Sequence, residues 1–391
     1  MESNYSPVND RIGHLAVVWK DLTLIWGGRK SKFFNKSKFF NPKIVHCHQD
    51  GVWIPKSTNG QIPHPTMNAV GEVIGDILYV ACGYLEDKHF TNELYSLNLK
   101  TWMWSKLEPN GTKPVKSSHM VSWISGEKIF LFGGWGNGKE DSKWYPESLE
   151  VKPHSLNPSL SVNNQLVYYE CQDNSWNWPT ITGLVPSPRV GHAAFSYSDS
   201  LKSVAFIFGG MDAWCVGHND IFIFDMSLMK WKSLPHRESS QTWPAARLFH
   251  TLTKISSEVA VLFGGKGSYG DSILGDCWIM NIKKAIYYSG NLIDVWTRLE
   301  HHENNGVSRL HKAIKEPSSN RLWILGGVGE NEVLTNSIRA LTFTAPSLKV
   351  LATESAAKHV ARLSTELEKL PKTDILRCAV EAKARDKYVI S

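Results

Sequence analysis

The sequence lacks any apolar run long enough to cross a membrane as a helix, and its first ten residues lack the charged and apolar regions of a signal peptide. Cysteine is scarce: six residues are scattered without a CxxC pair, which predicts neither disulfides nor a zinc site. Such cysteines are typical of a reducing compartment, so we expect a cytoplasmic or nuclear protein. The net charge of +6, from 43 basic and 37 acidic residues, does not predict a nucleic-acid or membrane partner.

Catalytic motifs are also missing. The sequence has no glycine-rich phosphate loop, no GxSxG elbow and no HExxH helix. Two histidine pairs, His46 with His48 and His301 with His302, have no third ligand beside them. We therefore expect neither an enzyme nor a cofactor. An enzyme acting on a small molecule stays as an alternative, which a convergent acid–base set or a bound metal would favour.

What the sequence does contain is a repeat, because an apolar run ending in two small residues recurs six times. Four of the five intervals between the run ends measure 51 to 62 residues. The fifth measures 76 residues and indicates an insertion in the third unit. The terminal doublets are Gly27-Gly28, Cys82-Gly83, Gly133-Gly134, Gly209-Gly210, Gly264-Gly265 and Gly326-Gly327.

Two further elements keep the same period. An Arg-x-x-His element precedes three doublets, and it begins at Arg11, Arg189 and Arg247. The other three units carry remnants of it, namely Thr66-Met67-Asn68, Ser117-Ser118-His119 and Arg309-Leu310-His311. A tryptophan follows each of the first five doublets, and these are Trp53, Trp104, Trp178, Trp231 and Trp296.

These signatures resemble the kelch repeat over about residues 9–345, which implies an all-β fold, a six-bladed kelch β-propeller spanning residues 1–345. A four-stranded blade cannot bury both faces alone, whereas six blades around an axis bury each other. Glycine doublets permit positive φ where backbones crowd at the centre. We expect residues 1–8 to supply a strand that the sixth unit lacks. The repeated histidines predict a repeated structural hydrogen bond.

From Pro346 onward glycine and tryptophan disappear and helix-forming residues dominate. We therefore expect a short C-terminal α-helical tail over residues 346–391. Ala356, Val360, Leu363 and Leu367 recur at intervals of three and four, which predicts an apolar stripe. The stripe either packs on the propeller or binds the groove of a partner.

The tail resembles the elongin-binding box and cullin box of kelch-domain substrate receptors of cullin-2 ubiquitin ligases, because Ser347-Leu348-x-x-Leu351 is followed by Leu370-Pro371. The resemblance implies that Leu348 and Leu351 bind elongin B/C and that Leu370 and Pro371 meet cullin-2. It predicts the non-catalytic substrate-recognition subunit of a cullin-RING E3 ligase. The apolar residues after Pro371 come one place later than in the family pattern, which leaves the cullin open. The alternative is a kelch interaction scaffold without a ligase role.

Receptors of this family hold the C-terminus of a client in the propeller funnel, which implies a C-degron site here. Their two carboxylate-binding arginines are missing from the stretch 211–218. We expect an apolar pocket in which Arg29 or Lys266 holds an anion, unless the candidate side chains are ordinary rim residues. The candidate peptide-binding residues are Arg29, His119, Trp135, Met211, Trp214, Leu248, Phe249, Lys266 and Leu310.

Overall fold

The computed structural model describes residues 7, 11–30, 38–49, 52–138, 145–235, 242–268, 272–288, 295–299, 309–317, 321–329 and 338–343. Within these ranges strands dominate, and the one helix, α1 (Ile282–Ile286), is too short to cross a membrane. The chain divides into two compact units, Met1–Leu341 and Thr342–Ser391. The expected helical tail, with Leu348, Leu351, Leu370 and Pro371, lies outside the described residues.

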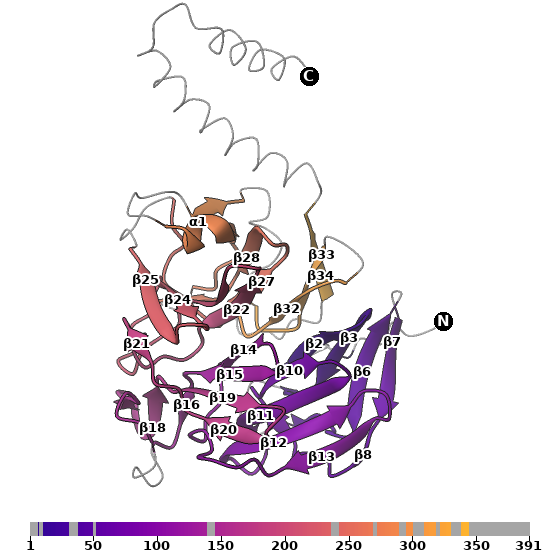
Figure 1. Cartoon of the computed structure of the whole chain (residues 1–391). Helices are drawn as coiled ribbons and strands as arrows, with labels where there is room; N and C mark the ends of the chain where they lie inside the picture. The colour runs from indigo at the N-terminus through magenta and orange to yellow at the C-terminus, as the bar shows by residue number, and fades with distance from the viewer. Residues whose placement is uncertain are drawn as a thin grey trace, which may run out of the picture. The chain divides into compact units, whose positions relative to one another are not determined.

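Six antiparallel sheets form the blades of a propeller (Figure 1). Blades one and two consist of β2 (Leu15–Trp19), β3 (Leu22–Trp26), β6 (Ile44–Gln49) and β7 (Val52–Ser57), then β10 (Val70–Ile74), β11 (Ile77–Leu85), β12 (Phe90–Asn98) and β13 (Met103–Leu107). Blades three and four consist of β14 (Val121–Ser125), β15 (Lys128–Phe132), β19 (Leu166–Glu170) and β20 (Ser175–Asn177), then β22 (Ala193–Ser198), β23 (Ser203–Phe208), β24 (Ile221–Asp225) and β25 (Lys230–Leu234). Blades five and six consist of β27 (Thr251–Lys254), β28 (Val259–Phe263), β30 (Cys277–Asn281) and β31 (Trp296–Arg298), then β32 (Lys312–Lys315), β33 (Arg321–Leu325) and β34 (Ile338–Thr342).

The first strand of every blade lies innermost, and these six strands close a ring. In chain order β2, β10, β14, β22, β27 and β32 each contact the next, and β32 contacts β2. The predicted six-bladed propeller is therefore confirmed. The expected closing strand at residues 1–8 lies outside the described residues except for Pro7, whose carbonyl oxygen accepts a 2.6 Å hydrogen bond from Arg11 Nε.

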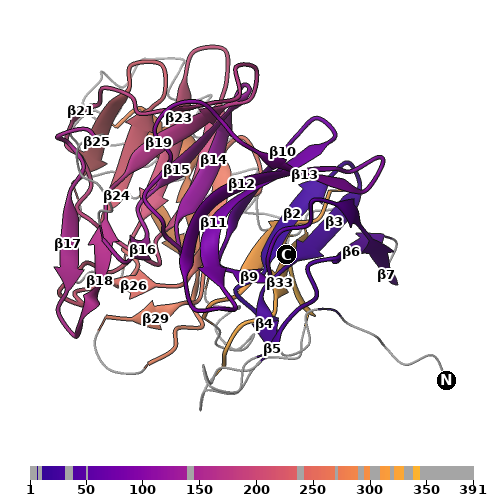
Figure 2. The same ribbon diagram turned by 90° about the horizontal axis from the view of Figure 1, so that it is seen from below.

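Short additional strands lie at one end of the propeller, toward the lower part of Figure 2. They are β1 (Arg11–Ile12), β4 (Arg29–Lys30), β5 (Lys38–Phe39), β9 (Thr66–Met67), β16 (Trp135–Gly136), β17 (Val151–His154), β18 (Asn157–Asn163), β26 (Arg247–Leu248) and β29 (Lys266–Gly267). Two further short strands, β8 (Asn59–Gly60) and β21 (Thr182–Gly183), pair in parallel with the fourth strands β13 and β25. The predicted insertion of the third unit is β16 to β18, between β15 and β19.

The core lies between the blades rather than inside any one of them. Trp104 of blade two packs on Trp26 of blade one with ring centroids 5.4 Å apart, and Trp231 of blade four packs on Phe132 of blade three at 5.2 Å. In blade three the equivalent ring is Trp176, which pairs with Tyr169 as Trp104 pairs with Leu97. The sequence assignment of Trp178 to that position was wrong by two residues, because both tryptophans fall within the expected spacing.

The predicted doublets turn the chain beside the axis. Both residues of every doublet have positive φ, including Cys82 at 59°, the one non-glycine member. A Cβ on Gly28 would lie 2.7 Å from the carbonyl oxygen of Ile12, and one on Gly210 would lie 2.9 Å from His192 Cβ. Because backbone and neighbouring side chain leave no room, the second doublet position requires glycine.

The doublets also tie neighbouring blades together. The N–H of the second doublet glycine donates to a carbonyl of the next blade: Gly28 to Thr66 at 2.8 Å, Gly83 to Ser117 at 2.8 Å, Gly134 to Arg189 at 3.0 Å and Gly210 to Arg247 at 2.9 Å. Gly327 of blade six donates to Arg11 of blade one at 3.4 Å. The same bond therefore recurs around the ring and closes it.

The Arg-x-x-His elements are structural. Arg247 donates to both carboxylate oxygens of Asp276 at 2.7 and 2.8 Å and to the Gly264 carbonyl, and Arg189 binds Asp220 and Gly209 in the same way. The histidine ring covers the first glycine of the preceding doublet, which leaves a Cβ on Gly133 only 2.6 Å from His192.

The residue before the histidine has positive φ in all six blades. In blades three and six these residues are His119 and Leu310, so Met120 and His311 occupy the histidine position. The sequence reading of the remnants, which placed His119 as a histidine equivalent, was therefore one position out of register. That shift turns the His119 side chain toward the axis, into the site described below.

We expect Gly210→Ala to lower the free energy of unfolding by more than about 3 kcal/mol, because positive φ and a close approach to His192 act together. The matched control is Gly126→Ala, a turn glycine with φ of 59° and no atom within 4 Å of its added Cβ, which should lose only about 1 kcal/mol. Urea unfolding of both variants measures the difference. Equal losses would contradict the crowding of backbones at the doublets.

Candidate functional site

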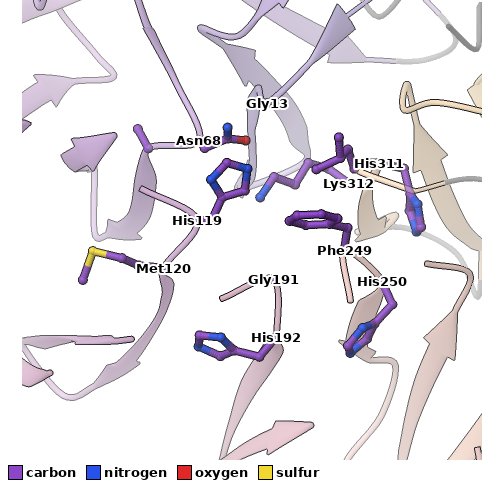
Figure 3. Close-up of a pocket in the computed structure, with 12 residues that line it drawn as sticks. Gly13, Asn68, His119, Met120, Gly191, His192, Phe249, His250, His311 and Lys312 are labelled. Carbon is purple, nitrogen blue, oxygen red and sulfur yellow. The ribbon is translucent and has the colours of Figure 1, made fainter. Parts of the chain in front are cut away.

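A cavity of about 70 Å³ opens at the axis, on the side of the Arg-x-x-His elements (Figure 3). Each blade contributes the positive-φ residue before its histidine position, and these six residues are Gly13, Asn68, His119, Gly191, Phe249 and Leu310. Backbone hydrogen bonds link them: Asn68 donates to Gly13 at 2.7 Å, Phe249 to Gly191 at 2.7 Å and Leu310 to Phe249 at 3.1 Å. The backbone ring is thus fixed, and the side chain at each place decides what the cavity presents.

His119 and Phe249 face each other across this ring with centroids 5.5 Å apart. Ser118 Oγ lies 3.0 Å from His119 Nδ1 and accepts a 3.0 Å hydrogen bond from Trp135 Nε1, so the imidazole is held in place. Burial, together with the positive charges of Lys312 and Arg29, lowers the pKa of His119 to about 3. The ring is therefore neutral near pH 7 and can serve as a hydrogen-bonding group, not as a charge.

Lys312 extends its side chain into the same space, and Figure 3 shows it beside His119 and Phe249. It is the first residue of β32, and the other innermost strands begin with Leu15, Val70, Val121, Ala193 and Thr251. Its amine makes no hydrogen bond or ion pair within the part of the chain that the structure describes. Burial lowers the pKa of Lys312, and the negative charge of Glu72 partly offsets that effect.

Glu72 is the acidic counterpart on the second blade. Ser122 of blade three donates a 2.8 Å hydrogen bond to Glu72 Oε1. Burial raises the pKa of Glu72 to about 7, although Ser122 and Lys312 pull it down. The axis therefore holds one acidic group from blade two and one basic group from blade six, with blade one between them, in an environment that disfavours both charges.

The structure brings only part of the predicted site together. His119, Phe249 and Leu310 line the cavity, whereas Leu248 is buried in β26, paired with Lys266 of β29. Arg29 is also buried, in β4, where burial lowers its pKa. Neither Arg29 nor Lys266 lines the cavity, so the structure gives no support for the prediction that one of them holds an anion there.

Trp135 and Met211 form a wall beside this floor. Both are half-buried and pack in one cluster with Val162, Val190 and Ala213. Trp214 lies farther out, with 61% of its surface exposed. The floor itself carries Asn68, His119 and Lys312, and is more polar than the expected apolar pocket.

Sequence reasoning missed Lys312. A signal was present, because a lysine stands directly after His311 where the equivalent positions of the other units are uncharged. Recognising it requires the six units to be aligned in register, which the shortened remnant of the sixth unit prevented.

The cavity can bind but shows no catalytic set. No group of three or more metal-ligating side chains occurs within the described ranges. His14, His192 and His250 are buried at equivalent positions, and burial lowers their pKa values. These rings recur around the axis and contact aromatic neighbours; the His192 and Phe132 ring centroids, for example, lie 5.4 Å apart. Their role is therefore in packing. The predicted repeated hydrogen bond of these rings was wrong, because neither ring nitrogen of His14, His192 or His250 has a hydrogen-bond partner among the described residues.

Comparison with known proteins agrees with this architecture. A family model described as the KLHDC2/KLHL20/DRC7 Kelch-repeats domain matches residues 13–152 and 154–365. Kelch domain-containing protein 1 of Mus musculus is 26% identical over 332 residues, which cover 82% of this chain and 76% of that protein. Kelch domain-containing protein 2 of Bos taurus is 24% identical over 368 residues, covering 91% and 84%. Host cell factor 2 of Homo sapiens is 31% identical over 284 residues, covering 68% of this chain and 32% of that protein.

The raised pKa of Glu72 has a consequence for stability. A carboxyl that binds its proton more tightly when folded stabilises the fold fully below its unfolded pKa of about 4.3, and this stability is lost as the pH rises through 7. Allowing for the partial exposure of Glu72 and for the charge of Lys312, we expect a loss of about 1–2 kcal/mol between pH 5 and pH 8.

Glu72→Gln should remove that pH dependence, as measured by urea unfolding at pH 5 and pH 8. Glu108→Gln is the control. The Glu108 side chain is 63% exposed, so this substitution should leave the pH dependence of the unfolding free energy unchanged. If the unfolding free energy of the Glu72→Gln variant changed with pH as much as that of the unmodified protein, Glu72 would be ionised at both pH values.

Proposed function

The chain belongs to the KLHDC2/KLHL20/DRC7 kelch-repeat family, and on that premise we propose that it is the substrate-recognition subunit of a cullin-RING E3 ubiquitin ligase. Its propeller is a kelch-repeat protein–protein interaction domain, of a family that is generally non-catalytic. In the proposal the axial cavity binds a client peptide and the tail recruits elongin B/C and cullin-2.

The observation that carries the proposal is the unpaired amine of Lys312 at the floor of an axial cavity. A half-buried ammonium group without a hydrogen-bond partner is unfavourable, and an anionic ligand group would compensate it. His119 and Asn68 offer further hydrogen-bonding groups, and Phe249 and Leu310 offer apolar surface. This combination suits the end of a peptide that carries a carboxylate beside an apolar side chain.

The size of the cavity favours a narrow ligand. About 70 Å³ accommodates a carboxylate or a small side chain but not a folded surface. Two of the six ring positions are glycines, and neighbouring side chains take the places of the missing Cβ atoms: Phe249 lies against Gly191 and Asn68 lies against Gly13. We therefore propose that the terminal group of the peptide enters the axis while the preceding residues lie along the wall made by Trp135 and Met211.

A peptide-binding measurement tests this assignment. Fluorescence polarisation with a panel of C-terminal peptides should show weak or no binding of peptides that end in Gly-Gly, because the family's arginine pair is absent. Peptides with an apolar residue next to the terminal carboxylate should bind better. Lys312→Met should weaken that binding about tenfold or more, which corresponds to the loss of one charged hydrogen bond.

The controls separate the three cations. Lys315 lies on the same strand as Lys312, and Lys315→Met should leave peptide binding unchanged. Unfolding curves of both variants show whether they fold. Arg29→Ala and Lys266→Ala should have smaller effects than Lys312→Met. Tight binding of Gly-Gly peptides that ignores Lys312→Met, or a loss confined to Arg29→Ala or Lys266→Ala, would place the anion elsewhere.

The recruitment half of the proposal rests on the tail sequence. Leu348→Asp in the full chain should abolish co-purification with elongin C and leave the melting temperature nearly unchanged, because a leucine kept for a partner is not part of the core. Burial of a leucine in the fold contributes roughly 2–5 kcal/mol. A large drop in melting temperature would instead place the stripe against the propeller and favour a scaffold without a ligase role.

A further inference from the structure

A thiol and an imidazole meet at the rim, outside the axial cavity. Cys215 Sγ lies 3.5 Å from His154 Nε2 and 3.7 Å from Ser155 Oγ. Cys215 belongs to the loop after the fourth doublet, and His154 ends β17 of the blade-three insertion. The Ser155 N–H donates a 2.8 Å hydrogen bond to the Ala213 carbonyl, so the two segments are joined by backbone as well.

The thiol is held in position. Its loop is a compact turn in which the Cys215 N–H donates to the Asp212 carbonyl at 3.2 Å. Trp214 and Val216 donate their backbone N–H groups to Asp212 Oδ1 at 2.9 and 3.0 Å. Cys215 is half-buried, between residues that are 61% and 49% exposed, so a small molecule can reach it.

The imidazole is buried, with its Nε2 beside the thiol. His154 is 7% exposed and packs edge-on against Trp135 with centroids 6.0 Å apart. Its Nδ1 has no hydrogen-bond partner among the residues that the structure describes, so no protein group fixes the tautomer. With the proton on Nδ1, Nε2 faces the thiol and can accept its proton. A cysteine beside such a base is a stronger nucleophile.

The other described cysteines have no such partner. Burial raises the pKa of Cys47 and Cys171 to about 11, and that of Cys82 and Cys277 to about 12. These thiols are held in their unreactive form at neutral pH. The contact of its thiol with an imidazole is the reason to treat Cys215 as a site rather than as one of several small buried hydrophobic residues.

We propose that Cys215 is a modification site for α,β-unsaturated aldehydes that carry an alkyl chain. The choice of ligand follows from the surface beside the thiol, where Trp214, Val216 and Leu156 are 61%, 49% and 81% exposed and provide an apolar surface for the chain. Leu156 follows directly after Ser155, which contacts the thiol.

The reaction needs no further reagent. His154 Nε2 takes the thiol proton, and Sγ forms a bond to the β-carbon of the aldehyde. The alkene electron pair moves toward the carbonyl to give an enolate, and the imidazolium returns the proton to the α-carbon. The product is a thioether with the aldehyde intact. The inference does not depend on the proposed ligase role, since it concerns the chemistry of the rim.

The test uses the full chain with Cys378→Ser, which removes the cysteine of the tail. The protein is treated with trans-2-nonenal at neutral pH, and peptide mapping by mass spectrometry gives the rate at each cysteine. Cys215 should react first, at least about tenfold faster than the same residue in urea-unfolded protein, as expected for an adjacent base. His154→Asn should lower the rate to the unfolded value.

Two comparisons make the outcome decisive. With trans-2-butenal, which lacks the long chain, the excess of the Cys215 labelling rate in folded over unfolded protein should be mostly lost. Trp214→Ala should reduce the difference between the Cys215 labelling rates of the two aldehydes. Equal rates for Cys215 in folded and unfolded protein, or first labelling of Cys171, would overturn the proposal. That comparison needs no variant of His154, so it decides even where His154→Asn does not fold.

Discussion

The close approach of six backbone turns to one axis is the constraint on which the rest of this structure depends. Two successive residues with positive φ follow the apolar run of the second strand in every blade, and in five of the six blades the second of them donates a recorded hydrogen bond to the neighbouring blade. Only glycine fits where a Cβ would meet a carbonyl or a histidine ring. Because the last bond of the series runs from Gly327 to Arg11, the ring is closed by backbone in the same way that it is built. Large side chains between the blades then fill the space that this spacing creates.

The same constraint separates framework from site. Arginine–aspartate pairs brace blades four and five internally, and histidines that cover glycines of the preceding blade join neighbouring blades. The residue before each histidine is held by backbone alone, so its side chain can vary without loss of the ring. Two of these positions carry the neutral His119 and the aromatic Phe249, and the amine of Lys312 lies beside them. Lys312 is half-buried, and the attraction of Glu72 only partly offsets the cost of that burial, which is why an anionic ligand is the natural partner for its amine.

Much of this fold could be predicted from the sequence, because glycine doublets and buried aromatic residues are dictated by geometry that repeats. The errors arose where a repeat was degenerate. Trp178 was preferred to Trp176, and His119 was aligned one residue out of register, since spacing alone does not reveal strand pairing. The cavity floor was expected to be apolar, and the predicted site did not include Lys312. The polarity of the floor depends on which inner strands face each other across the axis, and the sequence does not reveal this. The Cys215–His154 contact joins residues 61 apart and has no local sequence signal.

The most direct test of the account is a structure of the propeller bound to the tightest peptide from a C-terminal library. The account predicts the peptide carboxylate at the axis, about 3 Å from Lys312 Nζ, with the adjoining apolar side chain against Phe249. A peptide bound on the outer strands or at the opposite end of the propeller, with the axial cavity unchanged, would contradict it.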